Sequence, residues 1–279
     1  MILSFHPIIE ADRNIICAGR APDENDLNAI RQATAVILPQ GCSEALYRLA
    51  RTNCERIFPN LDVRFDHPGK RGQISLFRRL GIACPQTRCY ASVADFQTDP
   101  ALVGYPVVVK LDWGGQGETV FKATDRGELD RALQRAAAFE SSGQPGFLIQ
   151  QYVPSDGRSL RVVVIGSQTV SYWRCQPVPG RFGTSVEGGA RIDHHSDPDL
   201  QRAARLVVRD FCRRTGLQLG GFDFMFNSRA RIAEQPVPLM LEINYFFGRT
   251  GLGGSQVYYE MLAGEVDRWL GGLGLCRKP

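Results

Sequence analysis

Two acidic residues and an asparagine stand in two short apolar segments near the C-terminal end of the chain. Asp223 lies within Phe222–Phe226, and Glu242 and Asn244 alternate with apolar residues in Leu239–Asn244. Side chains alternate between the two faces of a strand, so pairing of these segments would bring the three polar side chains together on one face. Carboxylate and amide oxygens suit Mg²⁺, which ordinarily takes one or two carboxylates and completes its shell with phosphate oxygens. The aliphatic residues expected on the opposite face are Leu239, Leu241 and Ile243.

An ordinary solvated strand face would also explain each of these polar residues taken singly. The glycine-rich segment Gly248–Gly254 follows Asn244 after three residues. Two acids and an amide among apolar residues, next to such a segment, favour a metal site over a solvated face.

A lysine ends the β-branched segment Tyr105–Lys110, and three glycines follow it within seven residues, in Gly114–Gly117. Glycine amides can approach phosphate oxygens closely, and an ammonium at the end of a strand supplies a point charge. The lysine precedes the glycines, so the pattern is neither a P-loop nor a dinucleotide fingerprint. A phosphate site of another type is therefore one interpretation, and a solvated lysine at a strand end is the other.

The elements that must position these residues can be read from the apolar spacing. The first seventy residues alternate short apolar segments with polar helical ones, which predicts a small parallel α/β unit. A cluster of Pro, Gly and charged residues at 66–72 marks its candidate boundary. The strands expected in this unit are Ile2–Phe5, Ile15–Ala18 and Ala35–Leu38, and the helices are Glu24–Thr34 and Glu44–Thr52, the second capped by Ser43.

The remainder of the chain predicts further strands and helices around the polar residues. A helix is expected from Thr124 or Asp125, because apolar residues recur there at helical spacing. A second long helix begins at Asp197-Pro198 and stops at Gly216. The strands expected in this part are Tyr105–Lys110, Phe147–Val153, Leu160–Ile165, Gly221–Phe226 and Leu239–Ile243.

Length, charge and cysteine usage limit the class of protein. A chain of 279 residues favours about two domains. The balance of 33 basic against 29 acidic residues, +4 overall, gives no support for nucleic-acid binding. Eight scattered cysteines without a CxxC pair indicate free thiols in a reducing compartment. The first residues make a poor signal peptide and no apolar run reaches the ~18–20 residues of a membrane helix, so we expect a cytoplasmic location without membrane contact.

The order of these features resembles the ATP-grasp superfamily, and within it the RimK branch, which adds glutamate to a carboxyl terminus, and its glutathione-synthetase-like relatives. The resemblance covers roughly Lys70 to Leu262. It rests on the strand–Lys110–glycine loop–helix order followed by Leu148–Val153, Ser159–Val164, Gly220–Phe224 and Leu241–Asn244. It implies an α/β (α+β) fold: a short N-terminal α/β domain (1–70), a linker helix with an ATP-grasp lid subdomain (71–152), and a C-terminal antiparallel-sheet subdomain with the metal site (153–279).

The resemblance also implies a role for individual residues. Lys70, with Arg71 as its rival, resembles the first phosphate-binding lysine and Lys110 the second. Arg161 resembles the arginine that neutralises the transferred phosphate. The lid loop would be Gly114, Gly115, Gln116 and Gly117, the adenine-reading hinge would be Gln150, Gln151, Tyr152 and Val153, and the magnesium ligands would be Asp223, Glu242 and Asn244, with Glu242 bridging two ions.

Three positions depart from the family pattern. Gln151 stands where many relatives carry a glutamate, and Ser159 stands where a ribose-binding acid is expected, a role that Asp156 could take. Glu187 stands where the RimK branch has an arginine before Gly188-Gly189. These departures leave the nucleotide site largely intact and make the acceptor site different. The arginines expected around the phosphates and second substrate are Arg249, placed with Arg161 in catalysis, and Arg174, Arg181 and Arg191, placed in substrate binding.

The function that follows is an ATP-dependent ligase using Mg²⁺ or Mn²⁺. A small-molecule or peptide carboxylate would become an acyl phosphate, and an amine or thiol would displace the phosphate. An ATP-binding regulatory or scaffold module without turnover is the first alternative. A phosphotransferase is the second, and a nucleic-acid binder is the last. The oligomeric state, a homo-oligomer included, stays open.

Overall fold

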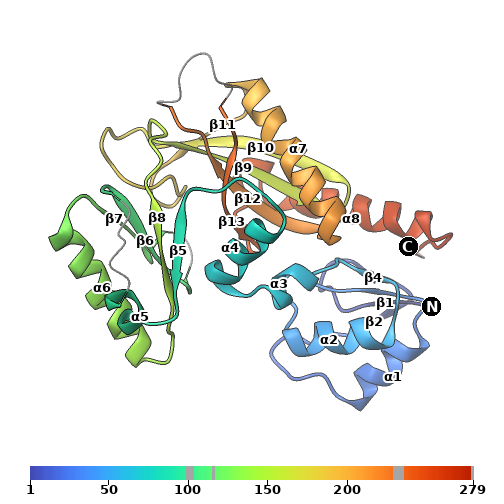
Figure 1. The fold of residues 1–279 in the computed structure, drawn as a ribbon. Coiled ribbons are helices and arrows are strands. Elements are labelled where there is room, and N and C mark those ends of the chain that lie inside the picture. Colours follow the sequence, from blue (N-terminus) through green and yellow to red (C-terminus); the bar gives the residue numbers. More distant parts are fainter. Residues whose placement is uncertain (99–103, 115–116, 229–235, 278–279) are drawn as a thin grey trace.

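The computed structural model describes residues 1–98, 104–114, 117–228 and 236–277, and within them the strands form three sheets. The N-terminal sheet, the middle sheet and the C-terminal sheet occupy separate parts of the molecule (Figure 1). A helix drawn in teal, α4 (Gly69–Arg79), lies between them (Figure 1). No helix in these residues is long and apolar enough to cross a membrane.

The N-terminal sheet is parallel, with strand order β2-β1-β3-β4. Helices α1 and α2 cover one face, where Ile30 and Tyr47 pack against Leu3 and Val36. The Ser43 hydroxyl accepts the Leu46 N–H (3.2 Å), which confirms the expected cap. The strands are β1 (Ile2–Ser4), β2 (Arg13–Asn14), β3 (Ala35–Ile37) and β4 (Ile57–Phe58), and the helices are α1 (Glu24–Gln32) and α2 (Glu44–Asn53).

One strand prediction for this unit was wrong. The segment Ile15–Ala18 is not a strand, and the pairing with β1 instead uses Arg13 and Asn14, two polar and exposed residues. Because β2 lies at the edge of the sheet, its backbone pairs without an apolar side chain to bury. Apolar content therefore misplaced the strand by two residues.

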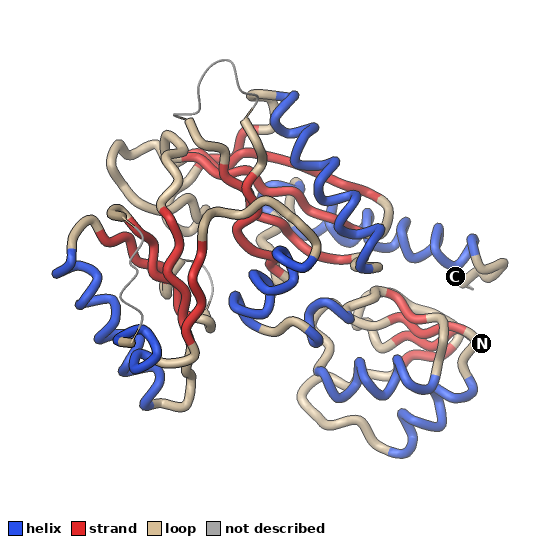
Figure 2. The backbone as a smooth tube through the Cα atoms, viewed as in Figure 1, coloured by secondary structure: helices blue, strands red, loops and turns tan. Residues whose placement is uncertain are grey.

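The middle sheet is antiparallel, with strand order β5-β8-β6-β7. Its α5 and α6 lie along one side of the sheet (Figure 2). Asp125 is the N-cap of α6, which agrees with the second of the two predicted start points, Thr124 and Asp125. The strands are β5 (Thr87–Tyr90), β6 (Val107–Leu111), β7 (Val120–Ala123) and β8 (Phe147–Gln151), and the helices are α5 (Val93–Gln97) and α6 (Arg126–Ser141).

The C-terminal sheet is antiparallel, with strand order β11-β10-β9-β12-β13. Residues Leu160 and Val162 of β9 face α4 and α7, whereas Val163 and Ile165 face α8. The strands are β9 (Arg158–Ile165), β10 (Gln168–Cys175), β11 (Arg191–Asp193), β12 (Leu219–Met225) and β13 (Leu239–Asn244), and the helices are α3 (Asp62–Asp66), α7 (Pro198–Thr215), α8 (Ser255–Gly272) and the 3-10 turn η1 (Thr250–Leu252).

A β-bulge interrupts the pairing of β12 with β13. Asp223 pairs with Glu242, but Phe224 pairs with Met240, so Leu241 is the extra residue. Met240 and Ile243 lie in the core, while Leu241 lines a cleft. The prediction that Leu239, Leu241 and Ile243 share one face was therefore wrong, because it assumed unbroken alternation.

Candidate active site

A cleft of about 1400 Å³ lies between the middle and C-terminal sheets. Strands β6, β7 and β8 supply one wall, and β9, β10, β12 and β13 supply the other. Two predicted residues, Gly115 and Gln116, fall outside the described residues. The predicted residues in the cleft lining are Lys70, Lys110, Gly114, Gly117, Gln150, Gln151, Tyr152, Val153, Asp156, Ser159, Arg161, Arg174, Arg181, Asp223, Glu242 and Asn244.

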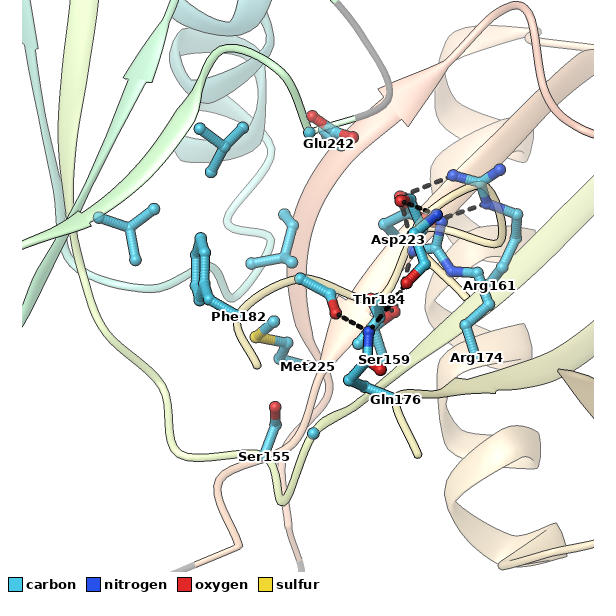
Figure 3. Close-up of a pocket in the computed structure, with 18 of the residues that line it drawn as sticks. Ser155, Ser159, Arg161, Arg174, Gln176, Phe182, Thr184, Asp223, Met225 and Glu242 are labelled. Carbon is cyan, nitrogen blue, oxygen red and sulfur yellow. Dashed lines mark hydrogen bonds and ion pairs between the residues drawn. The ribbon is translucent and has the colours of Figure 1, made fainter. Parts of the chain in front are cut away.

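Two arginines converge on the carboxylate of Asp223 (Figure 3). Arg161 donates to both oxygens at 2.7 Å, and Arg174 reaches Oδ2 at 2.9 Å. Burial alone would raise the pKa of Asp223, but the charges and hydrogen bonds of the two arginines outweigh it and hold the pKa at about 2. The carboxylate is therefore ionised, and its charge is matched on the C-terminal sheet itself.

Glu242 and Asn244 extend this group along β13. The Asn244 amide donates to Asp223 Oδ2 (3.1 Å) and to Glu242 Oε1 (3.2 Å). In Figure 3, Glu242 lies apart from the paired arginines. The pairing of Asp223 with Glu242 across the strands brings both carboxylates to the same face, as the sequence predicted.

The three residues fit a divalent cation that takes much of its coordination shell from elsewhere. The described residues contain no group of three or more His, Cys, Asp or Glu side chains arranged for a metal ion. Two carboxylates and an amide match the small protein share of a Mg²⁺ shell, which phosphate and water oxygens complete. A cation bound by Asp223 would displace N–H donors, such as those of Arg161, that now contact the carboxylate oxygens.

Both predicted lysines place their ammonium groups in the cleft. Lys110 at the end of β6 is buried, and desolvation lowers its pKa, partly countered by the charge of Glu242. Lys70, in the first turn of α4, donates to the Gly114 carbonyl (3.1 Å), and burial lowers its pKa too. Each lysine is desolvated with incomplete charge compensation, so a bound polyanion would stabilise both charged forms.

The expected adenine hinge is the end of β8 and the residues after it. The backbone N–H groups of Gln151 and Tyr152 already donate to Gln86 (2.8 Å) and Pro106 (3.3 Å). Among the described residues, no acceptor is recorded for the Val153 N–H. The amide of Gln150 is buried and donates to Thr87 Oγ1 (2.9 Å). The backbone groups of this hinge that could hydrogen-bond to an adenine base are therefore the Val153 N–H and the carbonyl groups.

Ser159 lies in a hydrogen-bond network rather than standing free for a ribose. Its hydroxyl is 2.6 Å from Thr184 Oγ1 and accepts from Arg174 Nη2 (2.9 Å). Asp156, at the rim, has a positive φ of 51° and accepts from the Ser228 hydroxyl (3.0 Å). Ser159 therefore joins Arg174 to the loop after β10, in which Phe182 projects into the cleft (Figure 3).

Two of the predicted arginines lie away from the cleft lining. Arg191 is exposed on β11, the edge strand. Arg249 stacks over the rings of Tyr258 (4.3 Å) and Tyr259 (4.5 Å), and its Nη1 is 3.3 Å from the Ser255 hydroxyl. The roles proposed for both arginines stay predictions.

Several cleft residues were not predicted from the sequence. Met225 and Leu241 add apolar surface, and Lys122 of β7 stacks over the Tyr152 ring (4.3 Å). Thr184 was not predicted from the sequence, and only its contact with Ser159 in the structure identifies it. Two of these residues could have been inferred from the sequence. Met225 stands in the same strand as the predicted Asp223, and Lys122 stands in β7, which pairs with the strand of the predicted Lys110.

The fold and this cleft define an ATP-grasp protein. A family model described as RimK-like ATP-grasp domain matches residues 69–249, which is more than half of the chain. The chain therefore belongs to the RimK-like ATP-grasp family, as the motif order predicted.

Curated relatives agree with this assignment. A probable alpha-L-glutamate ligase of Enterobacter sp. (strain 638) is 27% identical over 205 residues, 72% of this chain and 62% of the relative. Its counterpart from Shewanella amazonensis (strain ATCC BAA-1098 / SB2B), probable alpha-L-glutamate ligase 1, is 25% identical over 67% of this chain and 58% of the relative. The chain thus spans about three fifths of these relatives.

The solved structures bear on the fold alone. The RimK domain protein ATP-grasp from Sphaerobacter thermophilus DSM 20745 superposes with a TM-score of 0.60 at 16% identity, over 95% of this chain and 98% of that one. The VanG D-Ala:D-Ser ligase from Enterococcus faecalis gives 0.60 at 13% identity, over 85% and 73%. Both likenesses support the α/β architecture of several sheets.

Proposed function

We propose that this protein is an ATP-dependent ligase that joins a carboxylate to an amine or a thiol. One observation carries the proposal: the cleft brings Lys70 and Lys110 from one side toward Arg161, Asp223 and Glu242 on the other. A desolvated pair of lysines suits the phosphates of a nucleotide, and the facing carboxylates suit the divalent cation that accompanies it.

The first step would be attack of a substrate carboxylate oxygen on the γ-phosphorus of ATP. The bond from this phosphorus to the β,γ-bridging oxygen breaks, and the products are ADP and an acyl phosphate. Lys70, Lys110 and Arg161 would bind and orient the phosphates. Asp223, Glu242 and Asn244 would hold Mg²⁺ or Mn²⁺, which would supply charge neutralisation on the phosphate oxygens.

In the second step an amine or thiol attacks the acyl carbon, phosphate leaves, and the nucleophile loses a proton. The cleft walls would exclude water, which otherwise hydrolyses an acyl phosphate. Phosphoryl transfer depends on positioning and charge rather than on a nucleophilic side chain, and the lining includes charged groups such as Lys110, Arg161 and Glu242. Arg174 and Arg181, which line the cleft, are the candidate contacts of the acceptor.

The experiment is a screen for new amide masses after incubation with ATP, Mg²⁺ or Mn²⁺, and pooled small acids and amines, glutamate included because the curated relatives carry its name. Glu242→Gln keeps the size of the side chain and removes its charge. We expect at least about a hundredfold loss of substrate-stimulated phosphate release, a typical cost of removing one preorganised charge-stabilising group. Unchanged phosphate release would contradict the ligase assignment.

Glu260→Gln is the matched control, because Glu260 lies on the exposed side of α8, outside the cleft lining, and accepts a hydrogen bond from the Gln256 amide. It should release phosphate at the wild-type rate. Both variants are first compared in thermal unfolding, so that a loss of folded protein is separated from a loss of chemistry.

A nucleotide-binding module without turnover is the second candidate. The ion pairs of Asp223 with two arginines favour such a module, since they compensate the negative charge of this carboxylate without a ligand. If calorimetry shows binding of Mg-ATP and none of the pooled acids and amines gives an amide or a phosphorylated product, the protein is a nucleotide-binding module without turnover. A stable phosphorylated product without an amide would instead select a phosphotransferase.

A further inference from the structure

The first turn of α4 carries Lys70, but this helix has no capping side chain at its own start. The residue before it is Pro68, whose ring has no atom that accepts a hydrogen bond. The first N–H groups of a helix lack partners within the helix, so α4 must find an acceptor elsewhere. The helices that begin after a capping side chain include α1 (Asp23), α2 (Ser43) and α6 (Asp125).

Asp112 supplies the missing acceptor from the middle sheet. Its Oδ1 accepts the backbone N–H of Arg71 at 2.8 Å, the third position of α4, where an N-cap side chain would bond. Asp112 follows β6 directly, its side chain is only 10% exposed, and its own N–H donates to the Gly146 carbonyl (3.0 Å). The residue directly after a strand of the middle sheet thus caps a helix that precedes it by some forty residues.

The close approach of helix and carboxylate depends on a glycine. A Cβ at position 69 would lie 2.6 Å from Asp112 Oδ1, and Gly69 has a φ of +69°, which other residues rarely adopt. Only a glycine leaves this space free without a shift of the carboxylate. The sequence at the start of α4 is therefore matched to an external cap.

The first two turns of α4 are held from two sides. The Lys70 ammonium donates to the carbonyl of Gly114, two residues after Asp112. On the other side, the Gln73 amide exchanges two hydrogen bonds with the backbone of Ile243, between Glu242 and Asn244. Lys110 stands two residues before Asp112 on the strand, so the cap sets the distance between the two lysines.

We propose that Asp112 is a positioning residue for nucleotide phosphates: it caps α4 from the middle sheet and so fixes Lys70 relative to Lys110. This inference rests on the proposed nucleotide site. Asp112 acts through α4 and need not touch the nucleotide. Without the cap, the first turn of α4 frays, and ordering Lys70 on a triphosphate costs additional free energy.

The test compares Asp112→Ala with Asp125→Ala. Asp125 makes the same kind of bond, to the Glu128 N–H (2.8 Å), but on α6 and outside the cleft lining. Affinity for the Mg²⁺ complex of a non-hydrolysable ATP analogue is measured by calorimetry, and thermal unfolding is recorded beside it. We expect about fivefold weaker binding for Asp112→Ala, the equivalent of one helix cap, and wild-type affinity for Asp125→Ala, with similar losses of melting temperature.

Asp112→Asn separates the cap from the charge. An asparagine oxygen can accept the same N–H, so this variant should regain most of the affinity although the ion pair with Arg71 (4.0 Å) is gone. Asp112→Asn binding as weakly as Asp112→Ala would overturn the proposal, as would wild-type affinity in Asp112→Ala. If Asp112→Ala does not fold, Asp112→Ser, whose hydroxyl is too short to reach, takes its place. A wild-type protein that binds no nucleotide would refute the proposed function instead.

Discussion

His6 is buried where β1 ends, and it serves as a hydrogen-bond acceptor. Its Nδ1 accepts the backbone N–H groups of Ile8 (3.1 Å) and Ile9 (3.0 Å). Burial, with a further contribution from the charge of Arg249, lowers the pKa of His6 from 6.5 to about 4. The imidazole is therefore neutral near neutral pH, and protonation would remove its acceptor atom.

This pKa predicts a specific pH dependence of stability. Between pH 6.5 and about 4 the unfolded chain binds a proton at His6 that the folded chain does not, so the free energy of unfolding falls as the pH falls through this window. The stabilisation is fully present above pH 6.5. His6→Asn keeps an acceptor oxygen and should flatten this part of the profile, by on the order of 2 kcal/mol.

Urea unfolding at a series of pH values between 7 and 4 measures the effect. His195→Asn is the control, because His195 is exposed. Equal slopes for wild type and His6→Asn in this window would contradict the assigned role of His6.

At the residue scale, the sequence predicted that Asp223 and Glu242 share one face, but not which arginines pair with Asp223. The two acids stand in apolar strands, and Lys110 was singled out by its place at a strand end before three glycines. The pairing of Arg174 with Asp223 was not foreseen, because it depends on the register of β10 against β9 and of β9 against β12. Register is a property of three strands together, and no single segment encodes it.

At the element scale, β13 is the edge strand of the C-terminal sheet, and α4 covers part of its free edge. Gln73 accepts the Ile243 N–H (2.8 Å) and donates to the Ile243 carbonyl (2.9 Å), as a neighbouring strand would. The Met240 N–H donates to the Ala83 carbonyl (2.8 Å). This edge therefore pairs within the chain instead of presenting open backbone groups.

Gln73→Ala should lower the free energy of unfolding by about 2–3 kcal/mol, because it leaves a buried N–H and a buried carbonyl of Ile243 without partners. Urea denaturation at neutral pH measures the change. Gln256→Ala, on the exposed surface of α8, should alter stability by less than about 0.5 kcal/mol. Equal effects of the two substitutions would show that the edge contact is dispensable.

The elements themselves were predicted well where their apolar pattern is regular. α2, α6, α7 and the strands β6, β8, β9 and β12 lie within a few residues of the expected ranges. The prediction failed at β2, which buries no apolar side chain, and at the bulge of β13, where Leu241 breaks the alternation. Both features depend on the partner strand, so local pattern could not reveal them.

At the scale of the whole molecule, the N-terminal sheet is joined to α8 through an apolar interface. Ile37 and Phe58 pack with Leu262 and Val266, and the Phe58 and Trp269 rings lie 5.5 Å apart. These contacts bury the sheet face opposite α1 and α2. The N-terminal unit therefore shares its core with the C-terminal helix, and the two should unfold together.

Trp269→Ala should destabilise the protein by about 2 kcal/mol, below the usual cost at a fully buried tryptophan because this side chain is only partly buried. Differential scanning calorimetry would show a lower and broader transition. Trp113→Ala, at an exposed tryptophan, should leave the transition unchanged. A single sharp transition at the wild-type temperature in Trp269→Ala would mean that α8 does not stabilise the N-terminal sheet.

The contact between Gly69 and Asp112 also has an evolutionary consequence. A side chain at position 69 requires both a different backbone angle and the withdrawal of the carboxylate. A homologue that replaces Asp112 loses the external acceptor, and it regains the freedom to place a serine or an aspartate before this helix. Positions 69 and 112 should therefore change together in descent, although the chain separates them by more than forty residues.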